Sequence, residues 1–126
     1  MTPITSKNVQ LLLPLSSSSF CILLALAQGE RHGYHISKEV EAATGGTVKL
    51  QAGTLYRLIK QMTADGWITE VDRADPIDPR RRYYRLTPWG RKIAHAEAER
   101  LADLVRLART YRLLPAGASA KRRVTA

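Results

Sequence analysis

The chain has 126 residues, 44% of them apolar, which suits one small domain with a single core. Its 20 Lys and Arg outnumber 11 Asp and Glu, and the formal net charge of +9 favours a polyanionic partner, nucleic acid above an acidic membrane surface. A lone cysteine, Cys21, excludes an internal disulfide and is typical of an intracellular protein, and no apolar run reaches the ~18 residues of a membrane span.

Residues 1–15 predict a poorly specified N-terminal arm, in which Pro14 ends any helix and Leu11-Leu12-Leu13 can pack on the body of the domain. The same region imitates a signal peptide, since Lys7 precedes an apolar stretch and residues 25–27 read Ala-Leu-Ala like a cleavage site. Pro14 and the serines at 16–19 interrupt that stretch, so we expect no signal peptide. A secreted or anchored basic protein is the alternative, and the intact mass of the native protein decides it.

A helix with two apolar sides is predicted next, from a serine cap at Ser16 or Ser17 to about Gln28. Ile22 and Leu26 lie on the side opposite its other apolar residues. A helix that is apolar on both sides is buried on both sides, so the second side needs the C-terminal helix or a partner chain. We therefore expect Ile22 and Leu26 at a dimer interface.

A second helix is expected from about Tyr34 to Ala43, and Gly45-Gly46 ends it. Residues 47–50 then predict a short extended piece, long enough for a single bridge to a hairpin later in the chain. These elements lead directly into the third helix.

The third helix, from about Gly53 to Ala64, is the stretch around which we expect the function to be organised. Its apolar residues recur at i, i+3, i+4 and i+7, which forms one buried stripe of Leu55, Leu58, Ile59 and Met62. The opposite face carries hydrogen-bond donors, two cations (Arg57 and Lys60) and no acid. Such a face suits the major groove of DNA.

Two strand-like runs follow, Trp67–Val71 and Arg82–Leu86, both rich in aromatic or β-branched residues. The loop between them contains two prolines and ends in three consecutive arginines, which suit contacts to phosphate. Because side chains alternate along a strand, we expect one of Tyr83 and Tyr84 in the core and the other on the surface.

Thr87 and Pro88 predict the start of a last helix, with Thr as N-cap and Pro at the first position, and the helix can continue to about Arg112. Apolar residues in its second half step by 3, 4 and 3, a coiled-coil-like seam that so small a domain cannot cover alone. Residues 113–126 contain Lys121-Arg122-Arg123 and predict a disordered basic tail.

The order of these elements predicts a mainly helical fold with a small β-hairpin. We expect an arm at 1–15, a winged helix-turn-helix at 16–86, a dimerisation helix at 87–112 and a tail at 113–126. The expected DNA contacts are Gln51, Thr54, Tyr56, Arg57, Lys60, Arg80, Arg81 and Arg82. The expected dimer contacts are Ile22, Leu26, Leu101, Leu104, Ala108 and Tyr111.

Several alternatives stay open for these residues. Gln51 and Thr54 fit plain helix capping as well as phosphate contact, and the arginines fit a solvated turn. The three histidines lack ligand spacing with Cys21, and the sequence contains no catalytic set or phosphate loop, so we expect no metal site, no cofactor and no enzyme. A winged-helix adaptor for another protein, or a chain that binds DNA without sequence preference, remains the alternative function.

Five groups of residues resemble the PadR family of bacterial transcriptional regulators, in family order over about residues 16–92. They are Ile22-Leu23-Leu24-Ala25-Leu26, His32-Gly33-Tyr34, Gly53-Thr54-Leu55-Tyr56-Arg57-Leu58, Asp65-Gly66-Trp67-Ile68, and Arg81-Arg82-Tyr83-Tyr84-Arg85-Leu86-Thr87 with Gly90-Arg91. The single long C-terminal helix is similar to that of the smaller PadR subgroup.

The resemblance implies a cytoplasmic homodimer, nucleoid-associated when bound, that joins through the last helix and the partner's first helix and binds an inverted-repeat operator in double-stranded DNA. It implies a third helix in the major groove, a wing along the minor groove or its phosphates, and repression of a nearby operon. Release by a small hydrophobic or aromatic effector, such as a phenolic acid, is also implied.

The chain departs from the family pattern at two places. Ala52 stands where the family usually has Pro before Gly-Thr-Leu-Tyr, which loosens the predicted helix start. Leu101 and Leu104 occupy the middle of the last helix, where drug-binding members of the small subgroup place Trp. The second departure argues against a planar drug held between two subunits.

Overall fold

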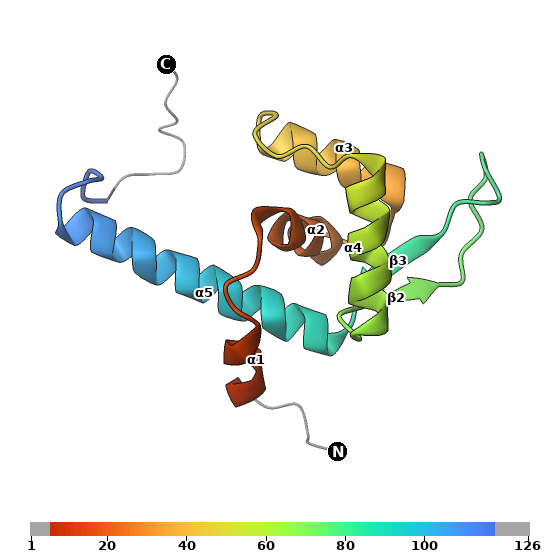
Figure 1. Cartoon of the computed structure of the whole chain (residues 1–126). Coiled ribbons are helices and arrows are strands. Elements are labelled where there is room, and N and C mark those ends of the chain that lie inside the picture. Colours follow the sequence, from red (N-terminus) through yellow and green to blue (C-terminus); the bar gives the residue numbers. More distant parts are fainter. Residues whose placement is uncertain (1–5, 118–126) are drawn as a thin grey trace.

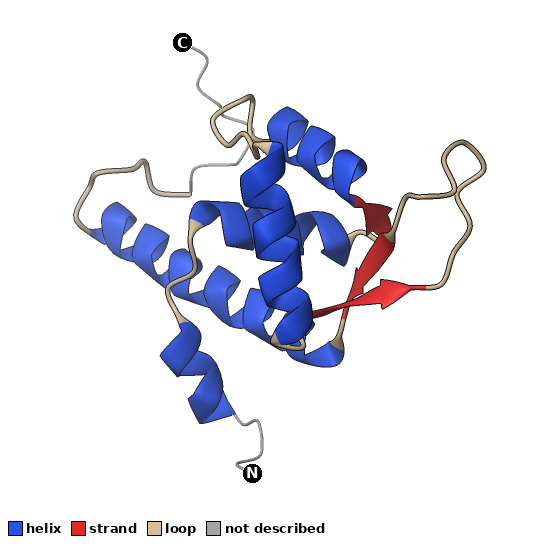
Figure 2. Cartoon of the chain, turned by 45° about the vertical axis from the view of Figure 1, so that its right-hand side comes forward, coloured by secondary structure: helices blue, strands red, loops and turns tan. Residues whose placement is uncertain are grey.

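The computed structural model describes residues 6–117 and shows the predicted winged-helix order (Figures 1 and 2). Its elements are α1 (Ser6–Leu12), α2 (Ser17–Ala27), β1 (Arg31–His32), α3 (Gly33–Ala43), α4 (Ala52–Ala64), β2 (Ile68–Val71), β3 (Tyr83–Leu86) and α5 (Pro88–Thr110). The predicted fold class is confirmed. The basic Lys121–Arg123 segment lies outside the described residues. Among the described helices, none combines the length and apolar character needed to cross a membrane.

Side-chain caps set the starts of three helices. Ser16 and Thr87 each accept a 3.0 Å hydrogen bond from the amide three residues on, as their sequence context predicts. The cap of α3 is less usual, because His32 Nδ1 accepts the amide of His35 at 3.2 Å. A ring nitrogen accepts only while it is unprotonated, so this cap requires neutral His32.

The sheet has three antiparallel strands in the order β1-β3-β2, and β1 pairs with residues 83–84 of β3. The prediction that residues 47–50 would bridge to the hairpin is therefore wrong. Thr44 Oγ1 accepts the amide of Val48 at 3.1 Å, so this segment folds back on the end of α3 instead. The two residues before α3 supply the third strand.

Helix α2 lies at the centre of the core, packed against both α3 and α5 (Figure 1). Ile22 and Leu26 are only 0% and 2% exposed there. This corrects their assignment to a dimer interface, because both apolar sides of α2 are covered within one chain and neither residue has surface left for a partner. Leu24, 46% exposed, is the large apolar residue that α2 leaves open.

The N-terminal arm is a short helix, α1, that packs on α5 and buries Val9 to 2% exposure. The link to α2 is also held by α5, since the carboxylate of Glu97, 1% exposed, accepts the amide of Leu15 at 3.3 Å. Arg100 holds that carboxylate at 2.7 and 2.8 Å and keeps its pKa below the ordinary value. Packing of the arm was expected through Leu11-Leu12-Leu13, but Leu11 is 84% exposed and Val9 makes the contact instead, because the partner is the distant α5.

The second half of α5 extends beyond the core (Figure 1). Leu104 and Leu107 are 50% exposed and Tyr111 is 73% exposed, while Leu101 and Ala108 are half-buried. So many uncovered apolar side chains along one helix are typical of an interaction surface.

Candidate nucleic-acid interface

Helix α4 buries three of the four residues of the predicted apolar stripe, leaves Leu58 half-buried and turns its polar face outward. Leu55, Ile59 and Met62 are buried, whereas Arg57 and Lys60 are exposed. No acid occurs from 52 to 64, and within residues 6–117 neither cation has an ion-pair partner. The helix therefore presents two unneutralised cations to solvent.

The start of α4 leaves its amide groups available to an anion. Gln51 is the N-cap residue and is exposed, but its side chain makes no cap hydrogen bond, and Thr54 is half-buried one turn in. Uncapped amides at a helix N-terminus favour negative charge. Lys38 and Lys49 line a hollow of about 370 Å³ beside Gln51, which sequence reasoning missed because they come from two separate segments.

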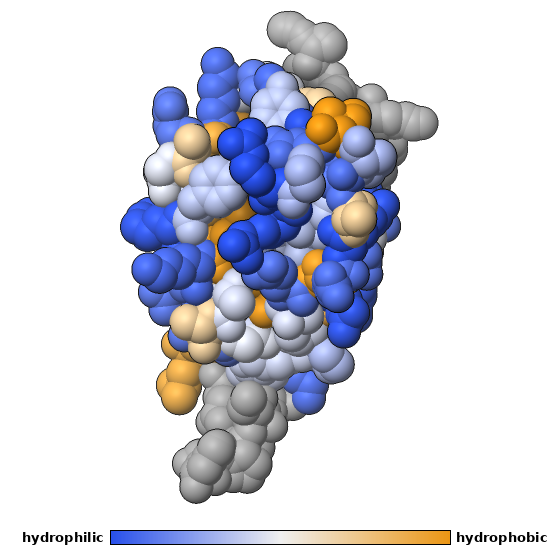
Figure 3. Space-filling model, turned by 90° about the vertical axis from the view of Figure 1, so that its right-hand side faces the viewer, coloured by the Kyte–Doolittle hydropathy of each residue, from blue (hydrophilic) through white to orange (hydrophobic). Residues whose placement is uncertain are grey.

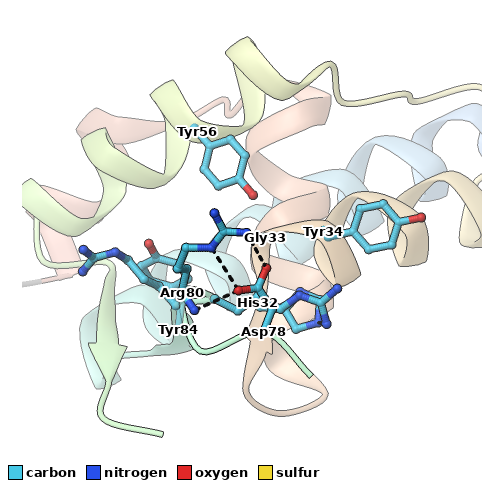
Figure 4. A pocket seen from close by; sticks show the side chains of 9 residues that line it. His32, Gly33, Tyr34, Tyr56, Asp78, Arg80 and Tyr84 are labelled. Carbon is cyan, nitrogen blue, oxygen red and sulfur yellow. Dashed lines mark hydrogen bonds and ion pairs between the residues drawn. The ribbon is translucent and has the colours of Figure 1, made fainter. Parts of the chain in front are cut away.

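Tyr56 is positioned by the glycine that opens α3. A Cβ atom on Gly33 would lie 2.6 Å from the Tyr56 hydroxyl and 2.8 Å from its ring. The ring therefore lies directly on the Gly33 backbone, and Figure 4 shows the hydroxyl reaching from α4 toward the wing. Tyr56 is half-exposed in this position, at 51%.

The wing is organised around Asp75, a loop residue that sequence reasoning did not single out. Its carboxylate accepts the amides of Ile77 at 2.8 Å and Asp78 at 2.9 Å, and the hydroxyl of Tyr83 donates to it at 2.6 Å. These hydrogen bonds, led by that of Tyr83, hold the pKa of Asp75 well below its ordinary value. The wing thus folds around one ionised carboxylate.

Tyr83 and Tyr84 are both buried, at 9% and 8% exposure. The prediction that one would face solvent is wrong. Alternation does place them on opposite faces of β3, but the wing loop covers the face of Tyr83 through Asp75, and Arg73 lies over its ring at 4.4 Å. The covering loop is a tertiary feature with no periodic trace in the sequence.

The three wing arginines each face an acid within the chain. Arg80 pairs with Asp78 at 3.2 Å, Arg81 with Asp75 at 3.5 Å, and Arg82 with Glu70 across the hairpin at 3.0 Å. Their side chains are 89%, 32% and 66% exposed, respectively. Arg81 is thus part of the wing's own framework, while Arg80 and Arg82 extend from it.

His32 joins the wing to α3. Its Nε2 lies 3.5 Å from Arg81 Nη1, and its ring meets the edge of Tyr83 with centroids 5.2 Å apart. Burial and the neighbouring Arg81 charge lower the pKa of His32. The neutral form that its cap requires is therefore the favoured form.

The helix and the wing enclose one hollow of about 620 Å³ (Figure 4). It is lined by His32, Gly33, Tyr34, Tyr56, Asp78, Arg80, Arg81, Arg82 and Tyr84. Four of the eight predicted DNA contacts thus meet in one place, and Figure 3 shows the largely hydrophilic surface on this side of the molecule. Within residues 6–117 no group of His, Cys, Asp and Glu could hold a metal ion.

This fold and surface define a winged helix-turn-helix of the kind used by DNA-binding regulators. The model of the transcriptional regulator PadR-like family matches residues 22–96, and the chain belongs to that family. The family resemblance predicted from the sequence is confirmed.

The chain is also similar to individual proteins. An uncharacterized 37.1 kDa protein in transposon Tn4556 of Streptomyces fradiae is 30% identical over 89 residues, and the match covers 71% of this chain but only 24% of that protein. A Streptococcus transcriptional regulator is 26% identical with a TM-score of 0.64, covering 75% of this chain and 90% of that one. Bacillus subtilis PadR, solved in complex with operator DNA, is 25% identical with a TM-score of 0.58, covering 64% and 46%.

Proposed function

We propose that this chain is a sequence-specific DNA-binding protein that acts as a dimeric repressor of a nearby operon. One observation carries the proposal: Tyr56, on the acid-free face of α4, and the three wing arginines border the same hollow, so the outward face of α4 and the wing lie on the same side of the molecule. The complex of Bacillus subtilis PadR with operator DNA supports this use of the fold.

Each side chain of this surface has a role set by its position. Arg57 is exposed on α4 and reads a guanine edge or a phosphate, and Lys60 contacts phosphate. Tyr56 is turned toward the wing, so it donates to backbone phosphate. Gln51 and Thr54 contact phosphate at the start of α4, where the helix dipole assists.

We place the dimer seam on the projecting half of α5, at Leu101, Leu104, Ala108 and Tyr111. Their exposed apolar surface supports this assignment, and a second copy of the chain gives two α4 helices that suit an inverted repeat. With about four phosphates neutralised by each protomer, a plot of the logarithm of the DNA-binding constant against the logarithm of the salt concentration has a slope of about −7 for the dimer. We call this the log-log salt slope. Release by a small hydrophobic or aromatic effector, as the family implies, is part of this proposal.

The test is a selection of genomic DNA fragments on the purified protein at near-physiological salt, followed by sequencing. We expect enrichment of a short inverted repeat near a promoter, and deletion of that repeat should raise expression of the adjacent gene. Uniform recovery of all fragments would leave only backbone binding and would contradict sequence-specific regulation.

A further inference from the structure

The ion pair between Arg80 and Asp78 lies inside the hollow between α4 and the wing. Arg80 Nε and Nη2 lie 3.2 and 3.5 Å from the two carboxylate oxygens of Asp78, and the Arg80 amide donates to Oδ1 at 3.0 Å (Figure 4). The Arg80 side chain is 89% exposed and that of Asp78 is 32% exposed. The pair is therefore open to an incoming ligand.

A carboxylate on arginine occupies the position that a phosphate would take. The planar guanidinium binds either group with the same fork of parallel N–H donors. Arg82 and the hydroxyl of Tyr56 line the same hollow and provide further donors to an anion there. With about 620 Å³ open to solvent, the hollow admits a phosphodiester beside the Asp78 carboxylate.

We propose that this hollow is the seat of one DNA backbone phosphate and that Asp78 occupies it as an internal competitor in the free protein. The inference rests on the proposed DNA binding and deepens it. Incoming DNA exchanges its phosphate for the Asp78 carboxylate on Arg80, and Asp78 then turns toward solvent. The competition by Asp78 thus weakens binding to every DNA duplex by the same factor, whatever its base sequence.

The exchange has a consequence for the salt dependence. Arg80 is already paired with Asp78 in the free chain, so the exchange brings no net positive charge to the phosphate and releases no counterion from the DNA at this position. Removal of the Asp78 charge therefore adds about 0.9 to the magnitude of the log-log salt slope for each protomer. For a dimer the slope changes from about −7 to about −9.

The test compares Asp78→Asn with Asp72→Asn, which removes the same charge from an exposed residue at the start of the wing loop. The amide side chain introduced by Asp78→Asn keeps an oxygen that accepts the Arg80 amide, so we expect an unchanged unfolding midpoint. Binding to genomic fragments is measured by fluorescence anisotropy from 50 to 300 mM KCl. At 150 mM KCl we expect Asp78→Asn to tighten binding about two- to fivefold, and the steeper slope makes this gain larger at lower salt and smaller at higher salt. We expect Asp72→Asn to change affinity by less than about 1.5-fold.

A third variant shows whether Asp78 acts through Arg80. In the Arg80→Ala background, we expect Asp78→Asn to increase DNA affinity no more than Asp72→Asn does, because no guanidinium remains to be released. An equal gain from both Asn variants in the native background, or an unchanged slope, would overturn the phosphate seat while DNA binding stands. Absence of DNA binding by the native chain and all variants would overturn both proposals.

Discussion

Helix α4 and the wing are both cationic, but they hold their charges in opposite ways. On α4, Arg57 and Lys60 have no ion-pair partner within residues 6–117. On the wing, the arginines at 80–82 each face an acid. A helix satisfies its own backbone hydrogen bonds, so its outward side chains are free for a ligand, whereas a long loop needs side chains to hold it.

The difference separates two kinds of mutation. We expect a change at Arg57 or Lys60 on the outward face of α4 to remove a proposed DNA contact and to leave the fold intact. A change in the wing alters the shape of the loop as well as its charge, because Asp75 and Arg81 belong to its framework.

Leu104→Glu has the largest expected effect. By separating the two protomers it should remove the α4 helix and the wing of the second copy from the DNA. A charge on the proposed seam should raise the dimer dissociation constant by at least ~100-fold, about 3 kcal/mol, and operator binding should fall with it. Sedimentation velocity over a range of concentrations measures this. Ala102→Glu adds the same charge to an exposed residue on the other side of α5 and should leave the dimer intact. A Leu104→Glu variant that sediments like the native dimer would show the seam to be wrongly placed.

Arg57→Ala tests the helix alone. We expect a loss of about 1–3 kcal/mol in operator binding, with relaxed preference at one base pair and no loss of stability, because Arg57 is exposed and unpaired. Competition assays on operator and random duplexes measure both effects. Arg106→Ala removes the same charge from the projecting part of α5, where Arg106 pairs with Asp103, and is the control for charge alone. Equal losses on the two duplexes would mean that Arg57 contacts only phosphate.

Gly33→Ala tests the contact between α4 and the start of α3. The added Cβ would lie 2.6 Å from the Tyr56 hydroxyl, so the tyrosine has to move, and we expect the free energy of unfolding to fall by about 1 kcal/mol. Urea unfolding gives this value. Gly53→Ala is the control, since its Cβ would meet nothing within 4 Å and alanine favours a helix. If both variants are equally stable, Tyr56 does not depend on Gly33.

Asp75→Asn tests the wing alone and should show a pH-dependent effect. The folded state lowers the pKa of Asp75, so its stabilisation is present above the unfolded value of about 4 and is lost as the pH falls toward the folded value. The stability difference between native chain and variant should therefore shrink below about pH 4. Urea unfolding at pH 7, 4 and 3 measures it, with Asp72→Asn as the control. A difference that does not vary with pH would exclude an ionised Asp75 at the centre of the wing.

The structure of α4 could largely be predicted from the sequence, whereas that of the wing could not. The apolar stripe of α4, the N-caps Ser16 and Thr87, and the order of elements were predicted, because each depends on residues within one or two helical turns. Ile22 and Leu26 were assigned to a partner because periodicity shows that a side is apolar but not what covers it. The strand at residues 31–32 was missed for a similar reason, since two residues carry no period.

The sequence by itself determined the winged-helix order, the acid-free face of α4 and its family, because local spacing and charge are written directly in the chain. Only the tertiary structure decided that Asp75 centres the wing and that Asp78 holds Arg80. It alone also showed that the Tyr56 ring packs on the Gly33 backbone and that the Glu97 carboxylate accepts the Leu15 amide in the link before α2. Each of these features brings together residues from separate elements or within an irregular loop, where hydrogen-bond geometry rather than sequence period selects the partners.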